Sequence, residues 1–383
     1  MTTFQRHVLF IFLLLLSPCE SFVVNKTLFR RRPALLHETR ESTYSLVNDQ
    51  PKTLLSQRIS TPISSLPPPP EASANPSDDG FRSFRQNVPL SVQHWLRDSG
   101  MLRFIVNSLV YIGLPGLVQQ YPDTLSTFLR LTNECTTIKY GNHPMQKMDV
   151  FEPKTVSKQS KGLVVICHGG AWGSGKKWMY RLTATRKLEH GYTIAVLGYR
   201  TYPDASVDGQ VSDIQRSLDK LKQRYPSQHT TILGHSSGSH IALLGVLQRK
   251  LKVDALICVA GVYDVVKHFM FEKGRGVDMI SPLLPANGHV EKEWVLRSPI
   301  RLVDETTRDI LPPTLLVHGA KDSVVPYTSA VDFYNALQQC QSDENCLLSI
   351  LPSTEHAETV IQLMVGGETQ DIVMEWLESQ VLE

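Results

Sequence analysis

The feature that most constrains the fold is a regular alternation, from about residue 133 onward, of short apolar runs with segments of helical spacing. The runs are continuously apolar, which is typical of strands buried on both faces of a parallel sheet, and the intervening segments are long enough to be crossover helices. We therefore predict an α/β fold with a mostly parallel central sheet flanked by helices. The central runs are GLVVICHGG, YTIAVLGYR, TTILGHSSG, DALICVAGVYD, PTLLVHGAKD and CLLSILPSTEH, preceded by an antiparallel pair, TTIKYG and QKMDVFEP.

The first 132 residues divide into three segments of different composition. Residues 1–21 carry a positive charge, an unbroken apolar run and a small-residue group, which is the order of a secretory signal peptide. Residues 22–87 are basic and then rich in Pro and Ser, which predicts a disordered linker or the transit part of a two-part plastid presequence. Residues 88–132 are apolar at helical spacing, so we predict an amphipathic helical segment that packs on the main domain or lies on a membrane surface.

Charge and cysteine content exclude several classes of protein. Lys and Arg number 39 against 37 Asp and Glu, a formal net charge of +2, so nothing favours a nucleic acid partner. Six scattered cysteines are too few for a disulfide scaffold or a zinc site. Cys340 and Cys346 stand six apart and either form a disulfide or remain free thiols. No two histidines show ligand spacing on one helix, and we predict neither a metal nor another cofactor.

One turn between an apolar run and a helical segment carries the sequence GHSSG, residues 234–238. This G-x-S-x-G form is that of a nucleophile elbow, in which a sharp turn exposes a serine hydroxyl above a sheet. Such a serine needs a base to remove its proton, and the base needs an orienting carboxylate. Both follow at the ends of later strands, in the order that the elbow requires. We predict a catalytic triad of Ser236 as nucleophile, Asp322 as orienting acid and His356 as base.

A glycine-rich turn, HGGAWGSG at residues 168–175, follows the first central strand and should stand beside the elbow. The pattern of a phosphate-binding loop fails there at its last position. Unpaired backbone N–H groups in such a turn can hold a developing oxyanion, and we expect Gly170, Ala171 and Ser237 to supply them. Trp172 is expected to line the pocket, and His235 to pack or hydrogen-bond locally. The full set of expected oxyanion and substrate-binding residues is Gly169, Gly170, Ala171, Trp172, His235 and Ser237.

The remaining histidines and loop carboxylates are weaker candidates for these roles. His168 is expected to shape its own turn, His240 to be a core or helix-face residue, and His318 precedes the acid and so stands in the wrong place for the base. Asp304 and Asp309 fall in a loop before a strand rather than after one, so Asp322 is preferred to both.

Together these motifs resemble the α/β-hydrolase superfamily over about residues 133–383. The His-Gly-Gly turn and LGYRTYPDA are similar to hormone-sensitive-lipase-like and BD-FAE-like esterases, although Ala171 stands where a third glycine is usual and still keeps its backbone N–H. HGGAW, GHSSGSH and the insert beginning GVYDVVKHF resemble isoprenylcysteine methylesterase-like proteins more closely. Kynurenine formamidases and feruloyl esterases share much of the pattern.

The resemblance implies a serine carboxylic-ester hydrolase that acts on a small-molecule ester without a cofactor. It implies in particular a membrane-associated enzyme of the endoplasmic reticulum or Golgi that hydrolyses the methyl ester of a prenylated cysteine. A plastid is the alternative compartment if the N-terminal segments form a two-part presequence. The alternatives are a kynurenine formamidase or feruloyl-esterase-like hydrolase, and a non-catalytic ligand-binding protein.

The insert at about residues 263–299 is the expected cap over the pocket. Its apolar residues either form an inner face suited to a lipid-like or aromatic group, or only attach the cap to the neighbouring helices. These residues are Val265, Val266, Phe269, Met270, Met279, Ile280, Leu283 and Leu284.

Overall fold

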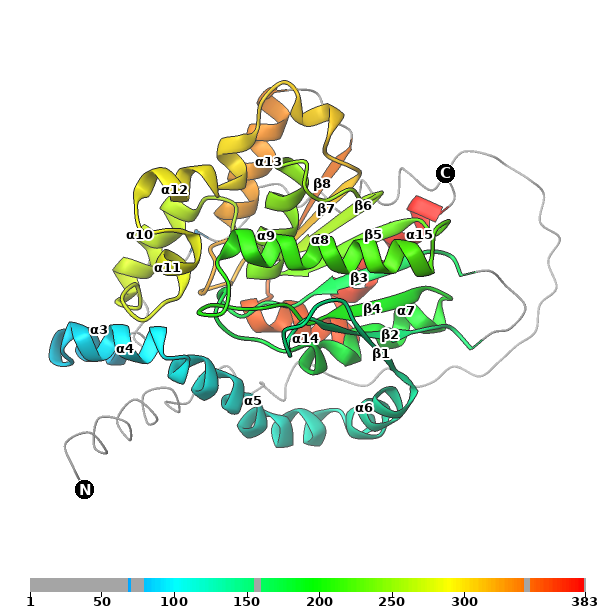
Figure 1. The fold of residues 1–383 in the computed structure, drawn as a ribbon, viewed down its shortest axis with the longest axis horizontal. Helices are drawn as coiled ribbons and strands as arrows, with labels where there is room; N and C mark the ends of the chain where they lie inside the picture. The colour runs from blue at the N-terminus through cyan, green and yellow to red at the C-terminus, as the bar shows by residue number, and fades with distance from the viewer. Residues whose placement is uncertain (1–67, 70–78, 155–159, 341–344, 382–383) are drawn as a thin grey trace.

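The computed structural model describes residues 68–69, 79–154, 160–340 and 345–381 (Figure 1). The predicted signal peptide and most of the predicted linker lie outside these residues. Within them, eight strands form one sheet in the order β1-β2-β4-β3-β5-β6-β7-β8. Strand β2 pairs antiparallel with β1 and β4, and all other pairings are parallel. The strands are β1 (Thr136–Lys139), β2 (Lys147–Phe151), β3 (Leu163–Cys167), β4 (Thr193–Leu197), β5 (Thr230–His235), β6 (Ala255–Val259), β7 (Thr314–Gly319) and β8 (Cys346–Leu351).

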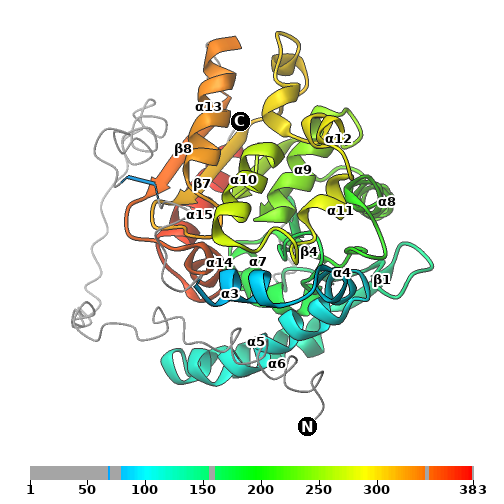
Figure 2. The same cartoon turned by 90° about the vertical axis from the view of Figure 1, so that its left-hand side faces the viewer.

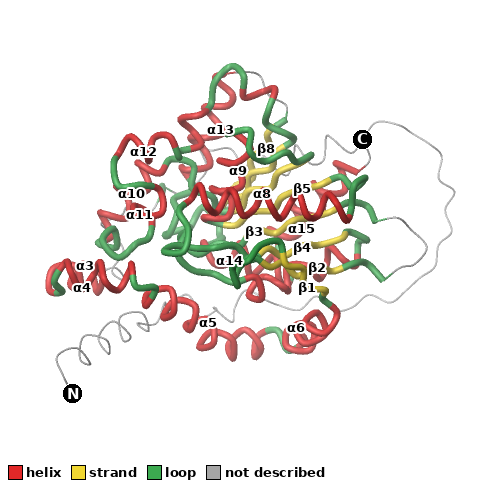
Figure 3. Tube along the Cα trace, viewed as in Figure 1, coloured by secondary structure: helices red, strands yellow, loops and turns green. Residues whose placement is uncertain are grey.

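The continuously apolar runs form the centre of this sheet. Every residue of β3, β4, β6 and β7 is buried, because helices cover both faces of the sheet (Figure 3). Alternate residues of β3 contribute to opposite faces: Val165 packs with one core cluster, and Val164 and Ile166 pack with the other. The predicted mostly parallel α/β fold is therefore confirmed.

Two sets of helices make these two cores. Helices α8 (Val207–Arg224), α9 (Ser237–Leu247) and α13 (Thr328–Cys340) supply residues to the first. Helices α14 (His356–Val365) and α15 (Glu368–Val381) supply the second, together with the 3-10 helix η4. Helix η4 spans Lys177–Ala184 and is followed at once by α7 (Thr185–Glu189). Two further 3-10 helices, η5 (Pro299–Leu302) and η6 (Thr307–Asp309), lie between the insert and β7.

The insert between β6 and β7 forms three short helices, α10 (Val265–Arg275), α11 (Leu283–Asn287) and α12 (Glu291–Leu296). Not all of the residues expected on an apolar inner face of this insert are buried. Met270 is 59% exposed, whereas the buried residues of α10 are Val265, His268 and Glu272. Two of these three are polar, and the helical period places all three on one face. The sequence pattern does not predict the buried polar pair, because a histidine and a glutamate at helical spacing look the same in sequence whether they are buried or exposed.

Among the described residues, the helices that precede the sheet are α3 (Asp79–Asn87), α4 (Leu90–Asp98), α5 (Met101–Gln120) and α6 (Asp123–Glu134). Figures 1 and 2 both show them along one side of the molecule. Helix α3 falls at the end of the segment that was assigned to a linker. Its Phe84 packs with Val88 and Leu96 in a small apolar cluster that also contacts Ile280 of the cap insert, so a contact distant in sequence stabilises this helix.

Cys340 and Cys346 are both free thiols in the structure.

No helix among the described residues is long and apolar enough to cross a membrane.

Candidate active site

The turn between β5 and α9 has the strained backbone of an elbow. Ser236 has φ 55° and ψ −123°, a conformation that non-glycine residues rarely adopt. The two glycines of the motif are required by close contacts. A Cβ on Gly234 would lie 2.6 Å from the backbone of Ser239, and one on Gly238 would lie 2.3 Å from the carbonyl oxygen of Cys167. The small residues therefore let the helix start directly against the end of β3.

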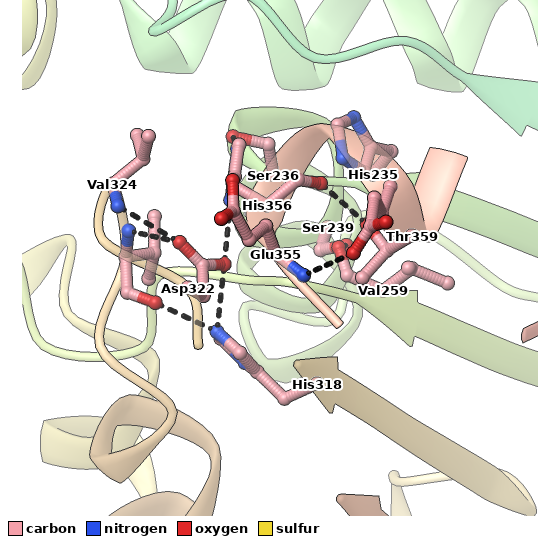
Figure 4. A network of polar contacts seen from close by, with 12 residues as sticks. His235, Ser236, Ser239, Val259, His318, Asp322, Val324, Glu355, His356 and Thr359 are labelled. Atoms are coloured by element: carbon pink, nitrogen blue, oxygen red, sulfur yellow. Dashed lines mark hydrogen bonds and ion pairs between the residues drawn. The ribbon is translucent and has the colours of Figure 1, made fainter. Parts of the chain in front are cut away.

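The structure brings the three predicted residues together in the predicted order (Figure 4). The Oγ of Ser236 lies 3.1 Å from Nε2 of His356, and Nδ1 of His356 lies 2.6 Å from Oδ2 of Asp322. With Nδ1–H donating to the carboxylate, Nε2 is free to accept the serine proton. Ser236 follows β5, Asp322 follows β7 and His356 begins α14, which itself follows β8.

The Asp322 carboxylate is fully buried and is held by several donors. Its Oδ1 accepts hydrogen bonds from the backbone N–H groups of Val324 at 2.9 Å and Val325 at 2.8 Å. Burial by itself raises the pKa of this carboxyl, but the charge and hydrogen bonds of His356 and His318 outweigh burial and hold the pKa below its usual value. Asp322 is therefore ionised at neutral pH.

His318 is a contact of this site that sequence reasoning missed. Its Nε2 donates to the carbonyl of Val325 at 2.8 Å and also lies 3.2 Å from Oδ2 of Asp322 (Figure 4). It was set aside as a base, and the structure places it away from Ser236, on the far side of the acid. The only sequence signal was its position four residues before Asp322 at the same strand end.

The glycine-rich turn lies directly against the elbow. A Cβ on Gly169 would stand 3.0 Å from the Cβ of Ser236. Among the described residues, none accepts a hydrogen bond from the backbone N–H of Gly170, Ala171 or Ser237, so these donors remain available. The N–H of Gly169 is not available, because it donates to the Tyr180 hydroxyl at 2.9 Å. Gly169 therefore lets the turn lie close to Ser236 but supplies no N–H group for an oxyanion.

Trp172 and His235 are both buried beside this turn. The Trp172 side chain is 2% exposed and its Nε1–H donates to Nδ1 of His240 at 2.9 Å, so the indole joins the turn to α9. Nδ1 of His235 accepts from the Tyr180 hydroxyl at 2.7 Å. Burial lowers the pKa of His235 to about 3, which keeps the ring neutral. His235 therefore bonds locally, through the tyrosine that also binds Gly169.

The polar face of α10 lies next to Trp172. The His268 ring stands 6.4 Å from the Trp172 ring, and its Nε2 is 3.6 Å from Oε1 of Glu272. Ser281 donates to the same oxygen at 3.0 Å. Burial raises the pKa of Glu272 to about 8, so this carboxyl is mostly protonated at neutral pH.

Glu272→Gln should change how stability depends on pH. The unfolded chain loses the Glu272 proton near pH 4.3, while the folded chain keeps it up to about pH 8. The folded state therefore binds more protons in this window, and the free energy of unfolding falls as pH rises through it. We expect the Tm of Glu272→Gln to fall less than that of the wild type between pH 5 and 8. Thermal scans at several pH values measure this, with the exposed Glu189→Gln as control; parallel curves for wild type and Glu272→Gln would contradict it.

This sheet, with a serine elbow after β5, an acid after β7 and a histidine after β8, defines an α/β-hydrolase fold. Within that class, residues 148–337 match the BD-FAE family model. Among the described residues, no group of three His, Cys, Asp or Glu side chains is placed to hold a metal ion.

Curated relatives extend the similarity along the chain. The probable isoprenylcysteine alpha-carbonyl methylesterase ICME of Oryza sativa subsp. japonica is 26% identical over 262 residues, which are 62% of this chain and 61% of that protein. The kynurenine formamidase of Salmo salar is 26% identical over 62% of this chain and 79% of its own length. The chain thus spans about three fifths of the methylesterase, and it is homologous to both.

Solved structures show the same fold. Esterase B from Lactobacillus rhamnosis aligns with a TM-score of 0.53 and 18% identity over 70% of this chain and 94% of that chain. A truncated carbohydrate esterase from gut microbiota aligns with a TM-score of 0.53 and 19% identity over 65% of this chain and 96% of that chain.

Proposed function

We propose that this protein is a serine hydrolase of carboxylic esters. The observation that carries the proposal is the hydrogen-bonded series from Ser236 Oγ to His356 at 3.1 Å and from His356 to Asp322 at 2.6 Å. The match to the BD-FAE family model and the relatives named as esterases support it.

The mechanism follows from this geometry. Ser236 Oγ attacks the ester carbonyl carbon while Nε2 of His356 takes the hydroxyl proton, and the N–H groups of Gly170, Ala171 and Ser237 stabilise the oxyanion. As the tetrahedral intermediate collapses, the alcohol leaves with the proton from His356. Water then attacks the acyl-enzyme, giving one proton to His356, and the acid product leaves as that proton returns to Ser236. Asp322 stays ionised throughout and stabilises the imidazolium.

The methyl ester of a prenylated cysteine is the substrate that we propose. The relatives named isoprenylcysteine alpha-carbonyl methylesterases support it. A second candidate is an aryl formamide, because the matched region covers 79% of the salmon kynurenine formamidase. The same three groups would cleave a formamide carbonyl by an equivalent acyl transfer.

A substrate comparison with the purified full chain tests this proposal. A fluorophosphonate should label Ser236, as read by peptide mass spectrometry, and p-nitrophenyl butyrate should be hydrolysed. Initial rates with a prenylcysteine methyl ester and with N-formylkynurenine then separate the two candidates. A folded chain that neither reacts with the fluorophosphonate nor hydrolyses any of these substrates would contradict the proposal and favour a non-catalytic ligand-binding protein.

We further propose that helices α4, α5 and α6 attach the protein peripherally to a membrane. These helices lie along one side of the molecule (Figures 1 and 2), and six of their large apolar side chains are exposed. Such a concentration of exposed apolar side chains is typical of an interaction surface, and a lipid surface suits a prenylated substrate. The six residues are Leu90, Trp95, Met101, Phe104, Leu125 and Leu129.

Phe104→Glu combined with Leu129→Glu should weaken vesicle binding by about tenfold or more, because two apolar side chains would no longer enter the bilayer surface. Sedimentation with phosphatidylcholine and phosphatidylserine vesicles measures this. Met270→Glu, which changes a 59% exposed methionine on the cap, is the control and should bind as the wild type does. Equal weakening by the control, or no binding by the wild type, would contradict the proposal.

For the compartment, we propose the endoplasmic reticulum or Golgi, with a plastid as the alternative. The signal peptide predicted for residues 1–21 supports entry into the secretory pathway. A fluorescent fusion of residues 1–90, imaged with markers of the three compartments, distinguishes them.

A further inference from the structure

The glycine-rich turn has an unusually strained backbone. Gly170, Ala171, Trp172 and Gly175 all have positive φ values, of 136°, 48°, 59° and 91°. Alanine and tryptophan rarely adopt such values, and they persist only where surrounding contacts hold them. The positions of the N–H groups of Gly170 and Ala171 therefore depend on what holds this turn.

Several of the contacts that hold it come from the α/β-hydrolase domain itself, residues 133–383. The N–H of Gly169 donates to Tyr180 at 2.9 Å. The carbonyl of Trp172 accepts two hydrogen bonds at 2.8 Å, from the backbone N–H of Tyr202 and from Nε2 of Gln210. These contacts fix the beginning and the middle of the turn.

The end of the turn is held from outside that domain. The N–H of Gly175 donates to Oδ1 of Asn107, on helix α5, at 2.9 Å, and Asn107 is only 8% exposed. The turn folds back on itself at this point, because a Cβ on Gly175 would lie 2.2 Å from the carbonyl oxygen of Gly169. Gly175 therefore packs directly against the peptide that precedes Gly170, whose carbonyl also bonds Nδ1 of His168 at 2.9 Å.

Helix α5 is itself anchored beside the turn. Arg103, one helical turn before Asn107, forms an ion pair with Asp204 at 2.5 Å. The hydroxyl of Tyr202 donates to Asp98, just before α5, at 2.8 Å. Tyr202 is the residue whose backbone N–H binds Trp172. Helix α5 and the glycine-rich turn are thus fastened to the same short segment, residues 202–204.

We propose that Asn107 is a positioning residue for the oxyanion donors, so that the N-terminal helices form part of the machinery of hydrolysis. This inference rests on the proposed esterase function. Asn107 lies outside residues 148–337, the region matched by the family model. Without its oxygen, the buried N–H of Gly175 has no acceptor, and the turn must shift to find one.

The size of the effect follows from the role of the donors. Losing one oxyanion donor costs about 10²–10³ in rate, and displacing donors should cost less than losing one. We expect Asn107→Leu, which keeps the shape and removes the acceptor, to slow the reaction about 10- to 100-fold. Asn107→Asp keeps an oxygen in place and should restore most of the rate.

The test measures the second-order rate at which a fluorophosphonate reacts with Ser236 in the full chain, because that reaction also places an oxygen on the oxyanion donors. Active-site titration gives the reactive fraction of each preparation, and kcat and KM for p-nitrophenyl butyrate are measured in parallel. Asn107→Leu should lower both the phosphonylation rate and kcat with KM within about threefold of the wild type. Ser108→Ala, the neighbouring position on α5, is the matched control and should leave all three unchanged.

A purely structural role predicts a different result, namely a smaller reactive fraction that still reacts at the wild-type rate. That result, or equal rates for Asn107→Leu and the wild type, overturns the inference. Arg103→Met provides a second variant in case Asn107→Leu does not fold, because it breaks only a partly exposed ion pair. It should slow phosphonylation about threefold, and a wild-type rate there counts against the inference. A wild type that reacts with the fluorophosphonate but hydrolyses no ester contradicts the proposed function alone.

Discussion

Ser236→Ala should lower kcat for p-nitrophenyl butyrate by about 10⁴-fold or more, while KM changes little. The hydroxyl is the atom that forms the acyl-enzyme, and alanine offers no substitute. The oxyanion donors are backbone groups, so the variant keeps them and retains their residual contribution. Steady-state kinetics and a thermal scan on the full chain measure the effect.

The stability of this variant separates lost chemistry from lost structure. Alanine meets the same backbone strain at φ 55° as serine does, so the Tm should stay close to that of the wild type. Ser212→Ala, which changes a serine of helix α8 that bonds only its own helix, is the control and should keep full activity. Activity of Ser236→Ala within tenfold of the wild type would show that another group performs the attack.

Asp322→Asn should reduce kcat by about 10⁴-fold at neutral pH. The carboxylate accepts the Nδ1 proton of His356, and an amide nitrogen in its place would instead donate to Nδ1. The proton would then lie on Nε2, the atom that must accept it from Ser236. Steady-state kinetics over a range of pH measure this loss of kcat, which we attribute to the wrong tautomer of His356.

A second carboxylate tests the assignment of the acid. Asp304 bonds Thr306 in an exposed loop, so Asp304→Asn should keep wild-type turnover. A larger loss in Asp304→Asn than in Asp322→Asn would reverse the assignment.

The sheet and the three site residues were predictable because local sequence determines them. Strands β3 and β6 are apolar at every position and β4 at every position except Thr193, and that composition fits a sheet covered on both faces. The order of Ser236, Asp322 and His356 followed from where strands end, since parallel strands bring their carboxyl ends to one edge.

Several of the contacts that sequence reasoning missed join segments far apart in the chain. Helix α3 is polar in composition, and its Arg85 faces Asp278 of the cap insert at 3.3 Å. Asn107 meets Gly175 only because α5 packs beside the glycine-rich turn. The N–H of Gly169 is occupied by the hydroxyl of Tyr180, which lies on the 3-10 helix η4, and the sequence pattern predicts a helix near residues 178–190 but not this contact. Local patterns carry no information about such partners.

The hydrogen bonds of Trp172 have a consequence for engineering the substrate range of the proposed hydrolase. Trp172 donates to His240, and Nε2 of His240 donates to the carbonyl of Arg297, which ends helix α12 of the cap. Arg297 in turn binds Asp208 of α8 at 2.7 Å. The glycine-rich turn, helix α9 and the end of α12 are therefore joined by one series of hydrogen bonds. Directed evolution of the cap for a new substrate will also alter turnover, and variants that keep both should carry paired changes along this series.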